Sequence, residues 1–193
     1  MDKGRVEAFS DGVIAIIITI MVLELKVPHG FGFKDLLPLA PVFAAYVLSF
    51  IYVGIYWNNH HHMLQLVHKV DGGVLWANLF LLFWLSMVPV TTAWMGENLL
   101  KPAPTALYGL VLLMDGIAYV VLQANLMRLE GPDSALARAL GRGFKEKISP
   151  LLYLLGTIAA FLVPQLSLAL YVAVAAIWIV PDRRVERQLG MTG

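Results

Sequence analysis

The sequence predicts an all-α integral membrane protein with six transmembrane helices, forming a single domain over residues 1–193. Hydrophobic residues make up 59% of the chain and charged residues only 14%, whereas a soluble domain has about 25% charged residues. Mean hydropathy is +0.74. The length of 193 residues suits this count, because each helix needs roughly 20 apolar residues to cross the hydrocarbon.

Six apolar runs define the expected helices, at residues 9–27, 39–57, 74–94, 105–127, 148–163 and 166–180. The breaks between them contain residues that end helices or favour turns. These breaks are Pro28-His29-Gly30, Asp71-Gly72-Gly73, Lys101-Pro102, Gly131-Pro132-Asp133 and Pro181-Asp182. The last two helices are joined by little more than Pro164-Gln165, which predicts an antiparallel hairpin.

Lysine and arginine gather in alternate connections. The N-terminal segment, the second and fourth connections and the C-terminal tail hold 11 of the 14 cations: Lys3, Arg5, Lys69, Arg128, Arg138, Arg142, Lys145, Lys147, Arg183, Arg184 and Arg187. Only Lys26, Lys34 and Lys101 fall on the other side. Because cytoplasmic loops collect Lys and Arg, both termini are predicted to be cytoplasmic, which requires an even number of spans.

The first run carries a Ser-Asp pair, Ser10-Asp11, inside an otherwise apolar helix. An ionisable residue in a membrane span marks a candidate functional site. On a helical wheel centred on Ile16, a stripe of residues lies within about 60° of it, and Ser10 and Asp11 lie about 120–140° away. The stripe consists of Ile16, Thr19, Ile20 and Leu23. It is therefore free to face lipid, a partner subunit or a pore, although ordinary helix packing would also explain it.

A carboxylate at the depth of Asp11 needs a partner, and His or Asn from another helix is the expected one. The second helix ends in a polar cluster at the same side of the membrane: Trp57, Asn58, Asn59, His60, His61 and His62. A metal site is the alternative, because His residues three or four positions apart can share an ion. Consecutive imidazoles point in different directions, however, so no metal is expected there.

The sequence resembles the FSD-motif potassium channels, the transmembrane protein 175 family. The resemblance rests on Arg5 followed by Phe9-Ser10-Asp11, on Trp57 with His60 and His61, on Asn78 with Pro89, and on Pro181-Asp182. It covers nearly the whole chain, and the first-helix motif is its specific part. Animal members carry two six-helix repeats, so a chain with one repeat implies a prokaryotic protein of the plasma membrane that assembles as a homotetramer.

This resemblance implies functions for the residues singled out above. First helices from four subunits would line the pore, with Ile16 at its narrowest ring, Thr19 supplying hydroxyls, and Ile20 and Leu23 forming further apolar layers. Motif residues would hold the first helix against the second and third and support assembly: Arg5, Phe9, Ser10, Asp11, Trp57, Asn58, His60, His61 and Asn78. Potassium near Ile16 and Thr19 would be the only metal ion. No cofactor, nucleic-acid partner or enzymatic activity is expected.

The expected function is a potassium-permeable cation channel with weak to moderate preference over sodium. The chain contains no Thr-Val-Gly-Tyr-Gly filter, so an isoleucine ring would act as a dewetting constriction that favours the more easily dehydrated ion. The alternative is a proton-coupled transporter or a proton-permeable channel that uses Asp11 and the mid-span Asp115. Inverted repeats and broken helices, which many transporters show, are not evident in the sequence.

Overall fold

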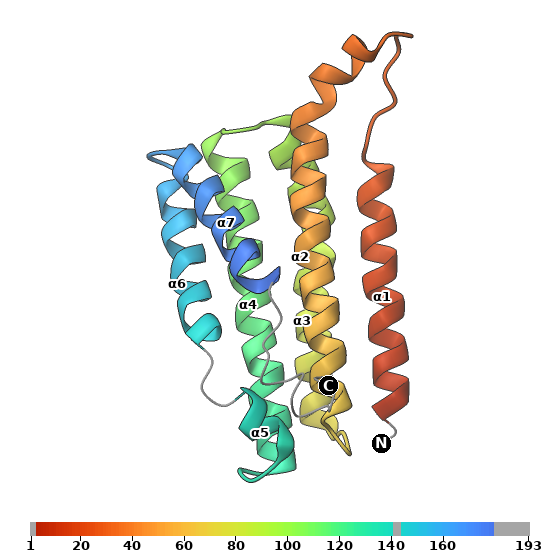
Figure 1. Ribbon diagram of the computed structural model, residues 1–193, viewed down its shortest axis with the longest axis vertical. Helices are drawn as coiled ribbons and strands as arrows, with labels where there is room; N and C mark the ends of the chain where they lie inside the picture. The colour runs from red at the N-terminus through yellow and green to blue at the C-terminus, as the bar shows by residue number, and fades with distance from the viewer. Residues whose placement is uncertain (1–2, 141–143, 180–193) are drawn as a thin grey trace, which may run out of the picture.

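The computed structural model describes residues 3–140 and 144–179, and this part of the chain is entirely helical in its regular elements (Figure 1). The expected helices of the six apolar runs are α1 (Lys3–Leu23), α2 (Ala40–Gln65), α3 (Gly72–Glu97), α4 (Pro102–Glu130), α6 (Phe144–Ala159) and α7 (Pro164–Ile179). Two short elements were not expected: a 3-10 helix η1 (Phe33–Leu39) before α2, and α5 (Ala135–Leu140) after α4.

Four of these helices are long and apolar enough to cross a membrane: α1, α2 together with η1, α3 and α4. The helices α6 and α7 are apolar but have 16 residues each, fewer than the roughly 20 that a span perpendicular to the bilayer needs. The all-α membrane class is therefore confirmed, and the count of six spans stays a prediction.

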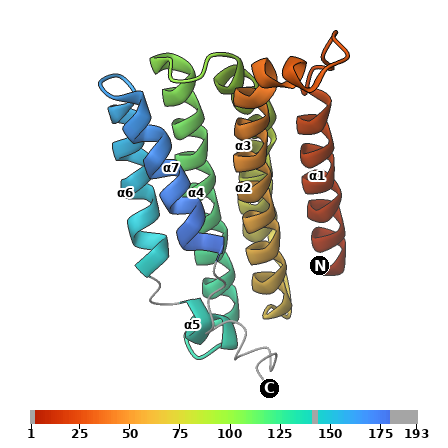
Figure 2. The ribbon, with the colours of Figure 1, turned by 45° about the horizontal axis from the view of Figure 1, so that its top comes forward.

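The helices lie side by side, with α1 at one edge and the α6–α7 pair at the other (Figures 1 and 2). The central helices α2 and α3 contact each other and both contact α1, while α4 contacts α3, α6 and α7. The N-terminal end of α1, the connection between α2 and α3, and α5 lie at one end of the bundle. The described cations predicted to be cytoplasmic belong to this end; Arg142, Arg183, Arg184 and Arg187 lie outside the described residues.

Helix boundaries follow the turn chemistry with one correction. Asp71 caps α3 by accepting a hydrogen bond from the Val74 backbone N–H at 2.9 Å, and Gly131 ends α4 with a positive φ of 94°, a conformation that glycine adopts without strain. The predicted Pro164-Gln165 connection is wrong, since residues 160–163 form the turn and Pro164 begins α7. Proline suits a first helical position, because its fixed φ fits the helix and its missing N–H needs no partner.

Candidate functional site

The edge helix α1 presents two faces. Its buried face packs on α2 and α3 and consists of Val6, Ser10, Ile14, Ile17 and Met21. Its exposed face is centred on Arg5, Phe9, Gly12, Ile16, Thr19, Ile20 and Leu23, and Gly4, Ala8, Ala15 and Val22 are exposed along one margin of it. The predicted stripe from Ile16 to Leu23 is therefore exposed in a single subunit, and it continues toward the N-terminal end through Gly12, Phe9 and Arg5.

Between Ile16 and Leu23 the exposed face is apolar around one hydroxyl. Ile16 is 58% exposed and Leu23 is 80% exposed, and between them Thr19 donates its hydroxyl proton to the Ile16 backbone carbonyl at 2.8 Å. Because a hydroxyl has one proton and two lone pairs, this bond uses the proton and leaves the lone pairs of the exposed Thr19 oxygen able to accept. The face can therefore offer an acceptor to a cation without any further rearrangement of α1.

A buried chain of hydrogen bonds joins α1, α3 and α2. Asn78 Nδ2 donates to Ser10 Oγ at 2.9 Å, and Asn78 Oδ1 lies 2.8 Å from His60 Nε2. The Ser10 hydroxyl in turn donates a hydrogen bond to the Val6 backbone carbonyl at 2.8 Å. All three side chains are buried, with exposed fractions of 0%, 2% and 0% for Ser10, Asn78 and His60. Because an asparagine oxygen can only accept, His60 carries its proton on Nε2.

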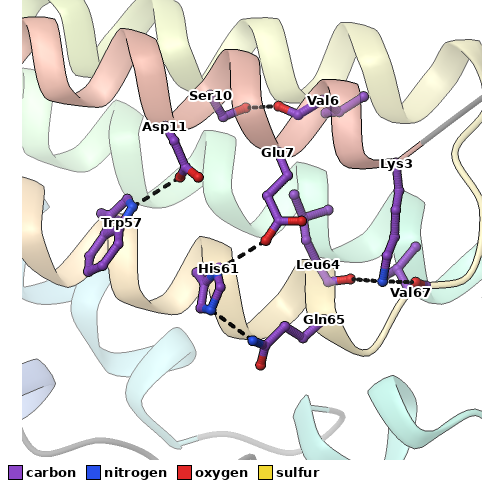
Figure 3. Close-up of polar contacts among 10 residues, drawn as sticks. All are labelled: Lys3, Val6, Glu7, Ser10, Asp11, Trp57, His61, Leu64, Gln65 and Val67. Carbon is purple, nitrogen blue, oxygen red and sulfur yellow. Dashed lines mark hydrogen bonds and ion pairs between the residues drawn. The ribbon is translucent and has the colours of Figure 1, made fainter.

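A second set of contacts joins the N-terminal half of α1 to the end of α2 (Figure 3). Trp57 Nε1 donates to Asp11 Oδ1 at 3.0 Å, and His61 Nδ1 lies 3.1 Å from Glu7 Oε1. Nearer the N-terminal end of α1, at the right of Figure 3, Lys3 Nζ donates to the backbone carbonyls of Leu64 at 3.2 Å and Val67 at 2.8 Å. Lys3 thereby satisfies carbonyls at the C-terminal end of α2, where a cation also complements the helix dipole.

These contacts correct two expectations. Asp11 bonds to Trp57 and not to His60, His61 or an asparagine, because His60 is turned toward Asn78 of α3 and His61 toward Glu7. Arg5 and Phe9 do not hold α1 against α2 and α3 within the subunit, because both lie on the exposed face, Phe9 at 55%.

Asn58 is half-buried beside Trp57 and takes no part in these contacts.

Sequence reasoning missed Lys3, Glu7 and Gln65. A periodic signal was nevertheless present, because Lys3, Glu7 and Asp11 recur every four residues, as do Trp57, His61 and Gln65. Residues four apart share one helix face. When two antiparallel helices each carry such a series on the facing side, each turn of one helix can place a polar side chain opposite one on the other. Gln65 completes the arrangement through Nε2, which lies 2.8 Å from His61 Nε2.

At the opposite end of the bundle, an ion pair holds the segment that follows α1 against the end of α3. The Lys26 ammonium bonds to the Glu97 carboxylate at the end of α3. This hydrogen bond and the charge of Glu97 raise the pKa of Lys26. The pair is exposed, so its contribution to stability is small, yet it links the end of α1 to α3 a second time.

Asp115, the mid-span carboxylate of α4, lies apart from the α1 contacts. It is fully buried, with an exposed fraction of 0%, and within the described residues neither of its oxygens has a hydrogen-bond partner. Its electrostatic neighbours are Tyr56, Tyr108 and Tyr153. The structure therefore separates Asp115 from Asp11, which faces α2 from the other edge of the bundle.

Known proteins resemble both the sequence and the fold. Residues 5–89 match the family described as Endosomal/lysosomal potassium channel TMEM175. A potassium channel from Chryseobacterium sp. is 54% identical over 189 residues, which is 98% of each chain. The human endosomal/lysosomal proton channel TMEM175 is 33% identical over 102 residues, which is 47% of this chain and 20% of the human protein.

A solved structure extends the similarity to the whole fold. The crystal structure of a lysosomal potassium-selective channel TMEM175 homolog from Chamaesiphon minutus matches with a TM-score of 0.77. It has 30% sequence identity and covers 92% of this chain and 96% of the other. The resemblance drawn from Phe9-Ser10-Asp11 and its companion residues is thereby confirmed, and the chain belongs to the TMEM175 family.

Proposed function

We propose that the chain is a potassium-permeable channel in which four copies of α1 surround a central pore. The observation that carries this proposal is the exposed face of α1, which holds Ile16 and Thr19 on a helix whose other face is fixed to α2 and α3. The names of the Chryseobacterium and Chamaesiphon relatives, both called potassium channels, support permeation of potassium.

The composition of this face favours a pore over lipid contact. Arg5 and Phe9 both lie within about 20° of Ile16 around the helix axis, so the same face includes a guanidinium, a threonine hydroxyl and a glycine. Arg5 precedes the apolar run at residues 9–27, so its guanidinium belongs to the aqueous end of this face, where long basic side chains reach water. A face with this mixture suits water and neighbouring subunits, and it gives Arg5 and Phe9 a place in assembly.

Ile16 would form the constriction of this pore. Four isoleucine side chains supply no ligand to an ion, so the ring excludes water and raises a barrier that is lower for the cation with the weaker hydration shell. The barrier is therefore lower for potassium than for sodium, because potassium has the weaker hydration shell. Thr19, one turn further on, presents oxygen lone pairs that partly replace the lost water, while Ile20 and Leu23 extend the apolar wall.

In this proposal α6 and α7 complete six spans, and both termini are cytoplasmic in a prokaryotic plasma membrane. Six helices agree with the alternation of cations. The 16-residue helices α6 and α7 would cross where neighbouring side chains or local bilayer thinning make up the difference in length.

Proton transport that uses both Asp11 and Asp115 is the less favoured function. Asp11 pairs with Trp57 at the α1 edge, and Asp115 lies in α4 among tyrosines, so the two carboxylates do not line one pathway. The name of the human relative, a proton channel, makes proton permeability worth measuring alongside potassium permeability.

The experiment that tests the proposal replaces Ile16 by asparagine in protein reconstituted into planar bilayers. Four amides would make the constriction easier to wet, so conductance should rise and the permeability ratio of potassium to sodium should fall toward unity. Val22→Asn is the matched control, because Val22 is 44% exposed and lies about 120° from Ile16. Ile17 is unsuitable as a control, since it is only 3% exposed and asparagine there would disturb packing.

Ohmic potassium current in the wild type, increased by Ile16→Asn and unchanged by Val22→Asn, is the expected result. A variant Ile16→Asn with wild-type conductance and selectivity, combined with altered permeation in Val22→Asn, would mean that another face of α1 lines the pore. Slow saturable flux that requires a proton gradient would contradict the channel itself.

A further inference from the structure

A groove opens at the end of the bundle that lies opposite the N-terminus of α1. Its wall comes from the segment after α1, from η1, from the start of α2 and from the end of α3. Figures 1 and 2 show η1 at this end, where the chain crosses from α1 to α2. The groove has a volume of about 890 Å³, within the usual range of binding sites, roughly 300–1,000 Å³. This space, called the η1 groove below, can therefore receive one or more large side chains.

The η1 groove has apolar walls and a charged rim. Most of the wall is formed by side chains such as Leu25, Pro28, Leu36, Leu37, Phe43 and Leu99. Glu24, Lys26 and Glu97 also line it, and the Lys26 ammonium is bonded to Glu97. Glu24 makes no ion pair or hydrogen bond of its own among the described residues, and it acts on Lys26 only through its charge. The rim therefore carries one carboxylate more than its cations neutralise.

The helix η1 is itself apolar but unpacked. Five of the seven residues in Phe33–Leu39 are Phe, Leu or Pro, and within this described segment no residue is buried. Phe33, the first of them, is 92% exposed. Lys34 follows it, is exposed, and makes no ion pair among the described residues. Exposed apolar surface rimmed by polar groups is typical of a contact with another molecule.

The turn that presents Phe33 is fixed by its own contacts. The Asp35 carboxylate accepts a hydrogen bond from the Gly32 backbone N–H at 2.9 Å. A Cβ at Gly30 would lie only 2.0 Å from the same carboxylate, so the glycine allows this close approach. Because the turn is already ordered, burying Phe33 against a partner costs little loop entropy.

We propose that Phe33 of one copy of the chain inserts into the η1 groove of the next copy, where Lys34 pairs with Glu24 of the partner subunit. The inference rests on the proposed function, because an assembly centred on α1 turns the segment after α1 toward neighbouring copies and away from lipid. The inserting and receiving surfaces differ, so the contact is head-to-tail and closes into a ring when the rotation between copies allows it. Phe31 precedes the fixed turn and stays accessible in this contact.

Cross-linking tests the contact, because the chain contains no cysteine. A full chain with Phe33→Cys, the inserting chain, and a full chain with Leu99→Cys, the receiving chain, carry different affinity tags. They are co-expressed and treated in the membrane with a short bis-maleimide. We expect covalent dimers that contain both tags. Leu107→Cys replaces Leu99→Cys in the control, where dimers should fall to background, because both leucines are 38% exposed and Leu107 lies outside the groove wall.

Charge reversal tests the ion pair across the contact. Lys34→Glu in the inserting chain, or Glu24→Lys in the receiving chain, places like charges together and should lower the yield of two-tag dimers about threefold. Both changes together should restore the yield. Lys101→Glu in the receiving chain is the control, since Lys101 is exposed at the same end of the bundle but does not line the groove. A combined variant that stays as low as the single ones would contradict the pairing.

Other neighbours of η1 give different products. Cross-links between two inserting chains would place the η1 helices against one another and would overturn the proposal. Equal yields with Leu99→Cys and Leu107→Cys would overturn it as well, and would mean that lipid covers the groove. A single chain with both Phe33→Cys and Leu99→Cys should give a ladder of products larger than dimers, whereas a ladder that stops at dimers would mean a two-fold contact and would overturn the head-to-tail arrangement.

The result is separable from that of the pore experiment. Missing two-tag dimers, combined with the expected effect of Ile16→Asn on conductance, would reject this contact and keep the channel. Two-tag dimers, combined with an Ile16→Asn variant that conducts as the wild type does, would keep the contact and reject the pore along α1.

Discussion

At the scale of single residues, Asn78 connects more of the structure than any motif residue of α1. Its amide bonds to Ser10 of α1 through nitrogen and to His60 of α2 through oxygen. Replacing it by alanine leaves the buried His60 Nε2 without a partner, at a cost of about 1–3 kcal/mol, while Ser10 keeps its hydrogen bond to the Val6 carbonyl. Asn78→Ala should therefore lower the thermal unfolding midpoint of the purified protein and reduce the fraction recovered as an oligomer.

Asn125→Ala provides the comparison for this prediction. The Asn125 amide donates to the Val121 carbonyl of its own helix at 2.9 Å and joins no second span, so its loss should have little effect on unfolding. Equal midpoints for Asn78→Ala and the wild type would show that the buried hydrogen bonds of Asn78 do not contribute to holding α1 in place.

The contact between Asp11 and Trp57 calls for a double-mutant cycle. Asp11→Asn keeps an oxygen that can accept the indole proton at 3.0 Å, whereas Asp11→Ala and Trp57→Phe each remove one side of the bond. The two removals should be non-additive by about 1 kcal/mol, the usual net value of one hydrogen bond. Full additivity, measured by thermal or denaturant unfolding, would show that the carboxylate acts elsewhere, for example across a subunit boundary.

Thr19 gives a prediction at the same scale for selectivity. Thr19→Val keeps the branched shape and removes the exposed oxygen whose lone pairs remain able to accept. The preference for potassium over sodium should fall, measured as a shift of reversal potential between potassium and sodium solutions, while the closed barrier at Ile16 stays. An unchanged reversal potential would assign selectivity to the apolar rings alone.

At the scale of the helices, the apolar runs predicted which segments form long helices better than they predicted where each helix ends. Breaks with a strong capping residue, such as Asp71 and Gly131, were located correctly. The end of α2 was not, because its polar residues from Asn58 to Gln65 lower hydrophobicity while the helix continues through contacts with α1. Helix α5 and the 3-10 helix η1 lack a periodic apolar signal long enough to predict.

The sequence predicted which residues share the face of α1 better than it predicted which side chains contact one another. Single-helix geometry placed Ile16, Thr19, Ile20 and Leu23 on one face, because a wheel needs only the helical period. Which imidazole meets which carboxylate depends on the rotation of α2 about its own axis against α1, and no local pattern fixes that rotation. This is why Trp57, and not His60 or His61, was found beside Asp11.

At the scale of the whole molecule, the alternation of cations predicts topology, and the chain without cysteine allows a direct test. Single cysteines at Met1 and Gly193, both outside the described residues, should be shielded from an impermeant thiol reagent in intact cells. A cysteine at Phe31 should react, because that side chain is fully exposed between α1 and η1. Reaction at one terminus only would require an odd number of spans and would exclude six.

The hydrogen bonds that join Ser10, Asn78 and His60 also determine the order in which the helices can pack together during synthesis. Ser10 and its partner are 68 positions apart, and His60, which shares that partner, lies between them. When α1 leaves the ribosome, none of the groups on other helices that will hold its polar residues has yet been made. The first helix must therefore wait in the bilayer or the insertion machinery with Asp11 unpaired and with Ser10 bonded only to the Val6 carbonyl of its own helix. Helix α2 brings the partner of Asp11 and only α3 brings the partner of Ser10, so the segment expected to line the pore is synthesised first and fully fixed in place late.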